Sequence, residues 1–294
     1  MSGRSMKVIP LAFDSLGTRS MSTFVETKDV KILIDPACDL APKRFGLPPH
    51  PLEEKRLKEH WANITRHAKA SDILIITHYH YDHHSPEKNT AIYKNKTVLV
   101  KHPTEKINAS QKARASLFLG KIRKTAREVK YSDGEKMKFG KTVLEFSPPV
   151  FHGKDSKLGY VTEVFIDDGY RFLYTSDVEG CNVKEQTDFI LEKEPNLLIM
   201  DGPLTSLLGF KYSYDDLNGA VKNLIEIVKT CPLDAMIIDH HLLRDLKWKE
   251  RIGKVFEQAR KRNIKIQTAA EFMGEPIDML EAHRRELYKK QPVV

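Results

Sequence analysis

The fold is decided by the stretch Thr77-His78-Tyr79-His80-Tyr81-Asp82-His83-His84, which follows the apolar run Ile73-Leu74-Ile75-Ile76. A short continuous apolar run is typical of a strand that is buried on both faces. We therefore expect a strand over residues 72–77. The chain would then leave the end of this strand with its histidines at a sheet edge, where ligand sites of α/β proteins tend to lie.

The spacing inside this stretch suits metal binding. His78 and His80 point to the same side if the chain stays extended, because strand side chains repeat every two residues. Asp82 and His83 follow in the turn and approach from a second direction. Imidazole nitrogens and carboxylate oxygens bind zinc at about 2.0–2.2 Å. Four ligands within six residues favour two metal ions over one; the alternatives are a solvent-exposed histidine-rich loop or a structural site.

Other segments also place an aspartate or a histidine near the end of an expected strand. They are Ile32-Leu33-Ile34-Asp35-Pro36, Phe151-His152-Gly153, Tyr174-Thr175-Ser176-Asp177 and Ile237-Ile238-Asp239-His240-His241. Each of them alone is a weak signal, since a lone histidine such as His152 is more often structural. Their value lies in appearing together with the histidine-rich stretch.

Together these motifs, in this order, resemble those of the metallo-β-lactamase superfamily over residues 32–241. The chain also resembles an uncharacterised archaeal branch of that superfamily. The resemblance implies an α/β fold, a four-layer αβ/βα sandwich of the metallo-β-lactamase type. No long linker interrupts the sequence, so we expect a single domain over residues 1–294.

The resemblance further implies a ligand set. It assigns His78, His80 and His152 to a first metal, Asp82, His83 and His240 to a second metal, and Asp177 to a position between them. We expect Asp82 and His240 to be needed for catalysis as well. His240 is preferred over His241 as the last ligand because it directly follows the strand.

Three residues are expected to support the ligands from outside: Asp35, Asp201 and His241. Asp35 matches an aspartate that supports a ligand histidine in the family. Asp201 ends an apolar run and could orient a ligand histidine; its alternative is a turn cap before Gly202-Pro203.

Such a site implies two divalent metal ions and hydrolysis. Imidazole-rich ligands favour Zn²⁺, and the two carboxylates also admit iron or manganese. Paired cations give hydroxide at neutral pH, which attacks a carbonyl carbon or phosphorus. The alternatives are a lactone or thioester hydrolase and a non-hydrolytic redox or structural metal protein. Redox relatives usually carry glutamate where His80 stands, which weakens the redox alternative.

The formal charge of +8 and the site itself favour a small anionic substrate. Among such substrates, a phosphodiester is preferred. Residues 105–130 are expected to be helical and basic, so nucleic acid is a second candidate partner. The alternative is a core-facing helix with a solvated basic side. The basic run within this segment consists of Lys112, Arg114, Lys121, Arg123, Lys124, Arg127 and Lys130.

No apolar run reaches the roughly 18 residues of a membrane span, so no membrane partner is expected. Cys38, Cys181 and Cys231 are odd in number and scattered. Such usage fits reduced thiols better than a disulfide framework. We therefore expect a cytoplasmic protein.

Overall fold

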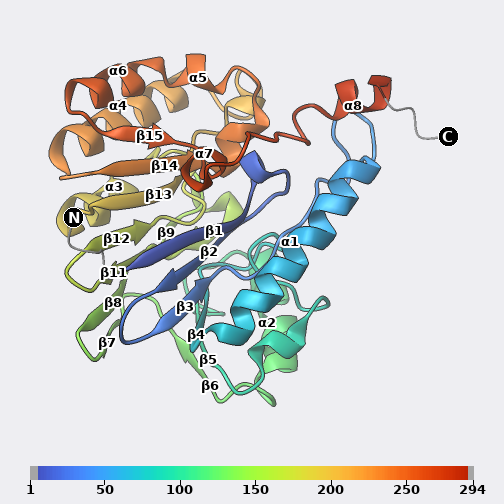
Figure 1. Cartoon of the computed structure of the whole chain (residues 1–294), viewed down its shortest axis with the longest axis vertical. Helices are drawn as coiled ribbons and strands as arrows, with labels where there is room; N and C mark the ends of the chain where they lie inside the picture. Colours follow the sequence, from blue (N-terminus) through green and yellow to red (C-terminus); the bar gives the residue numbers. More distant parts are fainter. Residues whose placement is uncertain (1–5, 291–294) are drawn as a thin grey trace.

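The computed structural model describes residues 6–290, which build two large sheets (Figure 1). The first sheet has six strands in the order β1-β2-β3-β4-β5-β6. Its strands are β1 (Lys7–Phe13), β2 (Met21–Glu26), β3 (Lys31–Ile34), β4 (Ile73–Ile76), β5 (Thr97–Val100) and β6 (Glu128–Tyr131). Strands β3 to β6 are parallel, while β1 and β2 add antiparallel pairs at one side.

The second sheet has seven strands in the order β15-β14-β13-β12-β11-β8-β7. Its strands are β7 (Lys136–Phe139), β8 (Thr142–Phe146), β11 (Val164–Asp167), β12 (Arg171–Tyr174), β13 (Leu197–Asp201), β14 (Ala235–Asp239) and β15 (Lys265–Gln267). Strands β12 to β15 are parallel. A short separate pair, β9 (Val150–Phe151) and β10 (Tyr160–Val161), leads to the candidate site.

Helices cover the outer face of each sheet. The helices α1 (Pro51–Ala70) and α2 (Ala109–Ile122) pack on the first sheet through a core that includes Ile64, Leu74 and Phe118. The second sheet is covered by α3 (Lys184–Lys193), α4 (Tyr214–Thr230), α5 (Trp248–Arg251) and α6 (Gly253–Lys261). A further core lies between the sheets and joins Ile34 to Tyr174 and Ile237. This helix–sheet–sheet–helix order confirms the four-layer sandwich.

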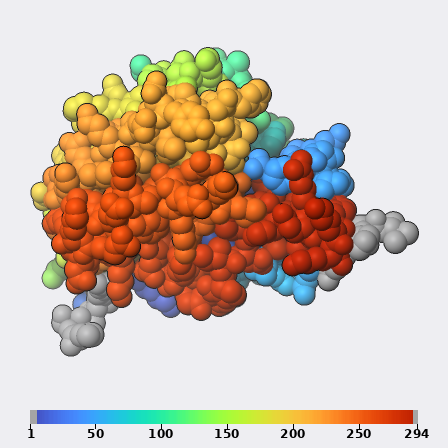
Figure 2. Space-filling view, turned by 90° about the horizontal axis from the view of Figure 1, so that it is seen from above, coloured from blue at the N-terminus to red at the C-terminus, as the bar shows by residue number. Residues whose placement is uncertain are grey.

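The end of the described chain returns to the first sheet's helix layer. After α7 (Ala269–Met273), the chain reaches α8 (Arg284–Lys290), which Figures 1 and 2 show beside the start of α1. Arg284 is fully buried there, and its Nη2 lies 2.7 Å from Oε1 of Glu53. A buried, two-pronged arginine–carboxylate pair fixes this contact in one geometry.

The expected secondary structure is confirmed at the site and wrong at one flank. The buried strand expected before the histidines is β4. The helix expected over residues 105–130 is shorter, because α2 ends at Ile122 and residues 128–131 form β6. Pairing of β6 with β5 outweighs the helical propensity of this basic segment. Across residues 6–290, none of the helices has the length and apolarity that crossing a bilayer takes.

Candidate metal centre

The parallel arrangement of strands brings the predicted residues to one place. In the first sheet, β3 and β4 are parallel, so Asp35 and the histidine-rich stretch leave the same edge. In the second sheet, β12, β13 and β14 are parallel, and their ends deliver Asp177, Asp201 and His240. The two sheets face each other, so these edges meet at one end of the sandwich.

Asp177 lies at the middle of the cluster. Its Oδ2 is 3.6 Å from Nε2 of His78, 3.1 Å from Nε2 of His152 and 3.4 Å from Nε2 of His240. Its Oδ1 is 3.0 Å from Nε2 of His83. One carboxylate therefore faces histidines from both halves of the predicted ligand set.

The ligand atoms fall into sets that share members. In each set, the ligand atoms lie within 4.8 Å of one another. One set holds His78, His80, His152 and Asp177, and another holds Asp82, His83 and His240. Asp177 and His240 occur together in a further set with His241. The structure thus brings together all seven residues assigned to metals, and their role as ligands stays a prediction.

The donor atoms of this cluster fit a metal better than they fit one another. Nε2 of His78, of His83 and of His152 are buried and have no hydrogen-bond partner among the described residues. The same holds for Oδ1 of Asp177. Leaving a buried polar atom unpaired costs about 1–3 kcal/mol. Several such atoms at one point are explained if a cation binds there, so the residues present fit a metal centre.

Asp35 supports His83 from behind. Its Oδ2 is 2.8 Å from Nδ1 of His83 and accepts a hydrogen bond from the Tyr174 hydroxyl at 2.7 Å. The backbone N–H and the hydroxyl of Thr77 also donate to Asp35. This arrangement leaves Nε2 of His83 to face the cluster. The role of Asp35 as the support of a metal ligand stays a prediction.

Asp14 supports His240 in the same way, and sequence reasoning missed it. Its Oδ2 lies 2.7 Å from Nδ1 of His240, and its Oδ1 accepts from Nε of Arg244 at 2.8 Å. Asp14 opens the short turn η1 (Asp14–Leu16) directly after β1. The signal was the one that identified Asp35, an aspartate at a strand end.

Asp201 orients His241, the neighbour of the predicted last ligand. Its Oδ2 is 2.9 Å from Nδ1 of His241, and its Oδ1 accepts from the His241 backbone N–H at 3.1 Å. The backbone N–H of Glu179 donates to the same carboxylate at 2.8 Å. The main contacts of the Asp201 carboxylate are therefore with His241 and Glu179, and not those of a cap on the following turn.

The backbone is held in an unfavourable region at three points of the site. Asp35, Ser176 and His240 have φ values of 47°, 59° and 58°. Residues with side chains rarely adopt this left-handed region, and such conformations gather at functional sites. Here they turn the chain sharply at the strand ends.

The carboxylates give the part of the site around His83 and His240 an affinity for positive charge. Burial lowers the pKa of His83, but Asp177, Asp35 and Asp82 outweigh burial and raise that pKa well above its ordinary value. Burial also lowers the pKa of His240, yet Asp177 and Asp14 raise it to about 10. A divalent cation meets the same demand for positive charge at this position.

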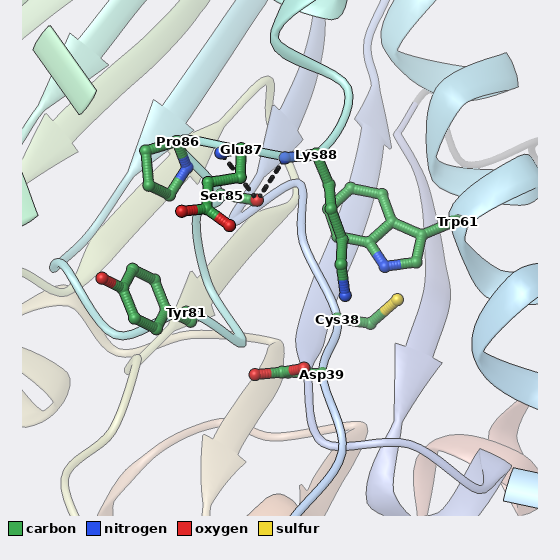
Figure 3. Close-up of a pocket in the computed structure, with 8 residues that line it drawn as sticks. All are labelled: Cys38, Asp39, Trp61, Tyr81, Ser85, Pro86, Glu87 and Lys88. Atoms are coloured by element: carbon green, nitrogen blue, oxygen red, sulfur yellow. Dashed lines mark hydrogen bonds between the residues drawn. The ribbon is translucent and has the colours of Figure 1, made fainter. Parts of the chain in front are cut away.

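A pocket of about 160 Å³ opens beside the histidine-rich stretch (Figure 3). It is lined by Cys38, Asp39, Trp61, Tyr81, Ser85, Pro86, Glu87 and Lys88. Figure 3 shows Trp61 and Tyr81 on opposite sides, with the Lys88 side chain overlapping the near edge of the Trp61 ring in this view. Tyr81 stands between His80 and Asp82, which are the two partly exposed members of the predicted ligand set. The pocket therefore adjoins the side of the cluster on which His80 and Asp82 are partly exposed.

Comparison with known sequences finds close relatives. The chain is 50% identical over 289 residues to a UPF0282 protein of Korarchaeum cryptofilum, covering 98% of this chain and 96% of that one. It is 44% identical to a UPF0282 protein of Methanocaldococcus jannaschii, covering 96% of each chain. No family model matches the sequence.

Solved structures share the architecture at low identity. Igni18, described as a novel metallo hydrolase from Ignicoccus hospitalis, superposes with a TM-score of 0.50 at 14% identity, covering 93% of this chain and 96% of that one. CmlA, a diiron β-hydroxylase from Streptomyces venezuelae, gives a TM-score of 0.54 at 15% identity. The match covers 91% of this chain and about half of CmlA, 53%.

Proposed function

The chain belongs to the archaeal UPF0282 family and has the metallo-β-lactamase fold, and we propose that it is a hydrolase with two divalent metal ions. Its substrate is a phosphodiester or another small anionic ester. The observation that carries the proposal is the position of Asp177 between two sets of inward-facing histidines. Zinc is the first candidate for the ion beside His78, His80 and His152, because imidazole nitrogens dominate the donors there.

Bound together, two such ions lower the pKa of a water molecule towards neutrality and stabilise negative charge on the substrate. The protein itself holds the histidine rings in position. Asp35 and Asp14 hold the rings of His83 and His240, so that neither has to reorient during turnover. Asp82 is 17% exposed, in contrast to the buried His83, and marks the side from which a substrate reaches the cluster.

The pocket beside the cluster supports a second candidate substrate. It carries one amine, Lys88, and two carboxylates, Asp39 and Glu87, so it does not favour a polyanion such as nucleic acid. Nε1 of Trp61 is buried there without a hydrogen-bond partner among the described residues. A pocket lined by the aromatic side chains of Trp61 and Tyr81 suits a less charged lactone or thioester.

The fold is also compatible with a redox function, because CmlA, a diiron β-hydroxylase, has a similar fold. Elemental analysis of the purified protein, paired with a panel of chromogenic phosphodiesters, lactones and thioesters, separates these functions. We expect two metal equivalents and turnover that is lost in His78→Ala and Asp177→Ala. Asp29→Asn is the control, since Asp29 binds Lys141 and Thr142 rather than the cluster. Two tightly bound metals without turnover of any ester would contradict the hydrolase.

A further inference from the structure

We propose that His241 is a further metal ligand, which binds the same ion as His240 and Asp177. The inference rests on the proposed dinuclear site and adds a donor to it. The ligand atoms of Asp177, His240 and His241 lie within 4.8 Å of one another. The rings of His240 and His241 are 4.5 Å apart between centroids, and the rings of His241 and His152 are 5.9 Å apart.

His241 has the same support as two of the predicted ligands. The distances from Nδ1 to a buried aspartate are 2.8 Å in His83, 2.7 Å in His240 and 2.9 Å in His241. A histidine whose Nδ1–H is held by a carboxylate presents the lone pair of Nε2, which is the form that binds metals. The ring of His241 is therefore held in the same orientation-fixing way as the rings of His83 and His240.

The aspartate behind His241 is itself fixed. Asp201 is fully buried at the end of β13, and β13 lies between β12 and β14 in the sheet. Its two oxygens accept hydrogen bonds from the backbone of Glu179 and of His241, in addition to the imidazole. A buried carboxylate is costly to keep. Holding the His241 ring in the orientation that binds a metal gives the buried Asp201 carboxylate a function.

The extra donor bears on the choice of metal. His240 belongs to the set with Asp82 and His83 and also to the set with Asp177 and His241. An ion shared by both sets meets more protein donors than the three that catalytic zinc usually takes with an open position. Six-coordinate ions such as iron or manganese accept this number more readily. The second ion is therefore iron or manganese in preference to zinc.

The test measures metal binding in the full chain without using turnover. Apo protein is titrated with Mn²⁺ and with Zn²⁺ in competition with a chromogenic chelator, which gives the dissociation constant of each site. We expect His241→Ala to weaken one of the two sites at least tenfold, with the larger loss for Mn²⁺, and to leave the other site unchanged. Asp201→Asn should weaken the same site to a smaller degree, because it loosens the ring without removing it.

Two controls make the result specific. His60→Ala removes a histidine that is 8% exposed, as is His241, and that contacts Thr18 outside the cluster. This variant should leave both dissociation constants unchanged. Added imidazole should restore the weakened site in His241→Ala, which a purely structural loss would not allow. If His241→Ala misfolds by circular dichroism, His241→Gln, which keeps much of the volume, takes its place.

The outcomes separate this inference from the proposed function. Two sites in the parent protein with both constants unchanged in His241→Ala would overturn the inference and leave the dinuclear hydrolase standing. Fewer than two sites in the parent protein would overturn both. A weakened site that binds Zn²⁺ and Mn²⁺ with equal losses would overturn the stated metal preference.

Discussion

Oδ2 of Asp14 lies 2.7 Å from Nδ1 of His240, although 226 residues separate the two in sequence. Asp14 follows the first strand of one sheet, and His240 follows a late strand of the other. The contact therefore exists only because the two sheets face each other. It ties the first turn of the described chain to the environment of the predicted last ligand.

We predict that Asp14→Ala weakens metal binding by about 10–100-fold, the usual cost of losing a residue that orients a metal ligand. Without the carboxylate, the His240 ring loses its fixed tautomer and orientation. Chelator competition measures the effect, with Asp29→Ala as the control. An Asp14→Ala protein that binds metal as tightly as the parent would remove Asp14 from the site.

Asp82→Ala is expected to reduce metal occupancy and abolish hydrolysis while the fold persists. Asp82 is 17% exposed and pairs only loosely, with Oδ2 3.7 Å from Nε2 of His240. Its loss should therefore cost little stability. Elemental analysis, ester turnover and thermal unfolding report the three parts separately. Full activity in this variant would exclude Asp82 from the mechanism.

Lys88→Ala should raise KM for an anionic ester about two- to fivefold and leave kcat nearly unchanged. Lys88 is exposed, and charge pairs at exposed positions contribute about 0.2–1 kcal/mol. The amine lies in the pocket and not among the predicted ligands (Figure 3). Steady-state kinetics checks this, with Lys94→Ala as an exposed lysine elsewhere. A fall in kcat at constant KM would contradict the assignment of Lys88 to substrate binding.

Glu281 predicts how the protein responds to acid. Burial raises its pKa, but Arg19, with Arg244 and Arg44, outweighs burial and lowers the pKa from 4.5 to about 2. Because the folded-state pKa is depressed, the stabilisation is complete above about pH 4.5 and is lost as the pH falls through 2. It amounts to something on the order of 3 kcal/mol.

Glu281→Gln should therefore lower the free energy of unfolding at pH 7, and the difference from the parent should shrink towards pH 2. Denaturant unfolding at a series of pH values measures it. Glu59→Gln, at a half-exposed carboxylate beside Arg56, is the control and should change little. A constant difference across the whole pH range would show that the ionisation of Glu281 is not involved.

The sequence was enough to predict the parts of the site that are local or that resemble known motifs. The run that became β4 identified the strand, and the offsets of two and three residues grouped His78, His80 and His83. Asp35 was found because it ends a strand. These signals depend on residues within a few positions of each other.

What the sequence could not give depends on packing between distant segments. Asp14 carries the same strand-end signal as Asp35, but nothing local pairs β1 with His240. Arg244 contacts Asp14 across the same interface. The helix expected over residues 105–130 was wrong because residues 128–131 pair with β5, a contact that helical propensity does not register.

The central claim is that two metal ions lie on either side of Asp177. Anomalous diffraction from a crystal of the metal-loaded protein, recorded at the absorption edge of the bound metal, tests it most directly. We predict two peaks about 3.5–4 Å apart. One should lie beside His78, His80 and His152, and the other beside Asp82, His83 and His240. A single peak, or peaks away from Asp177, would contradict the account.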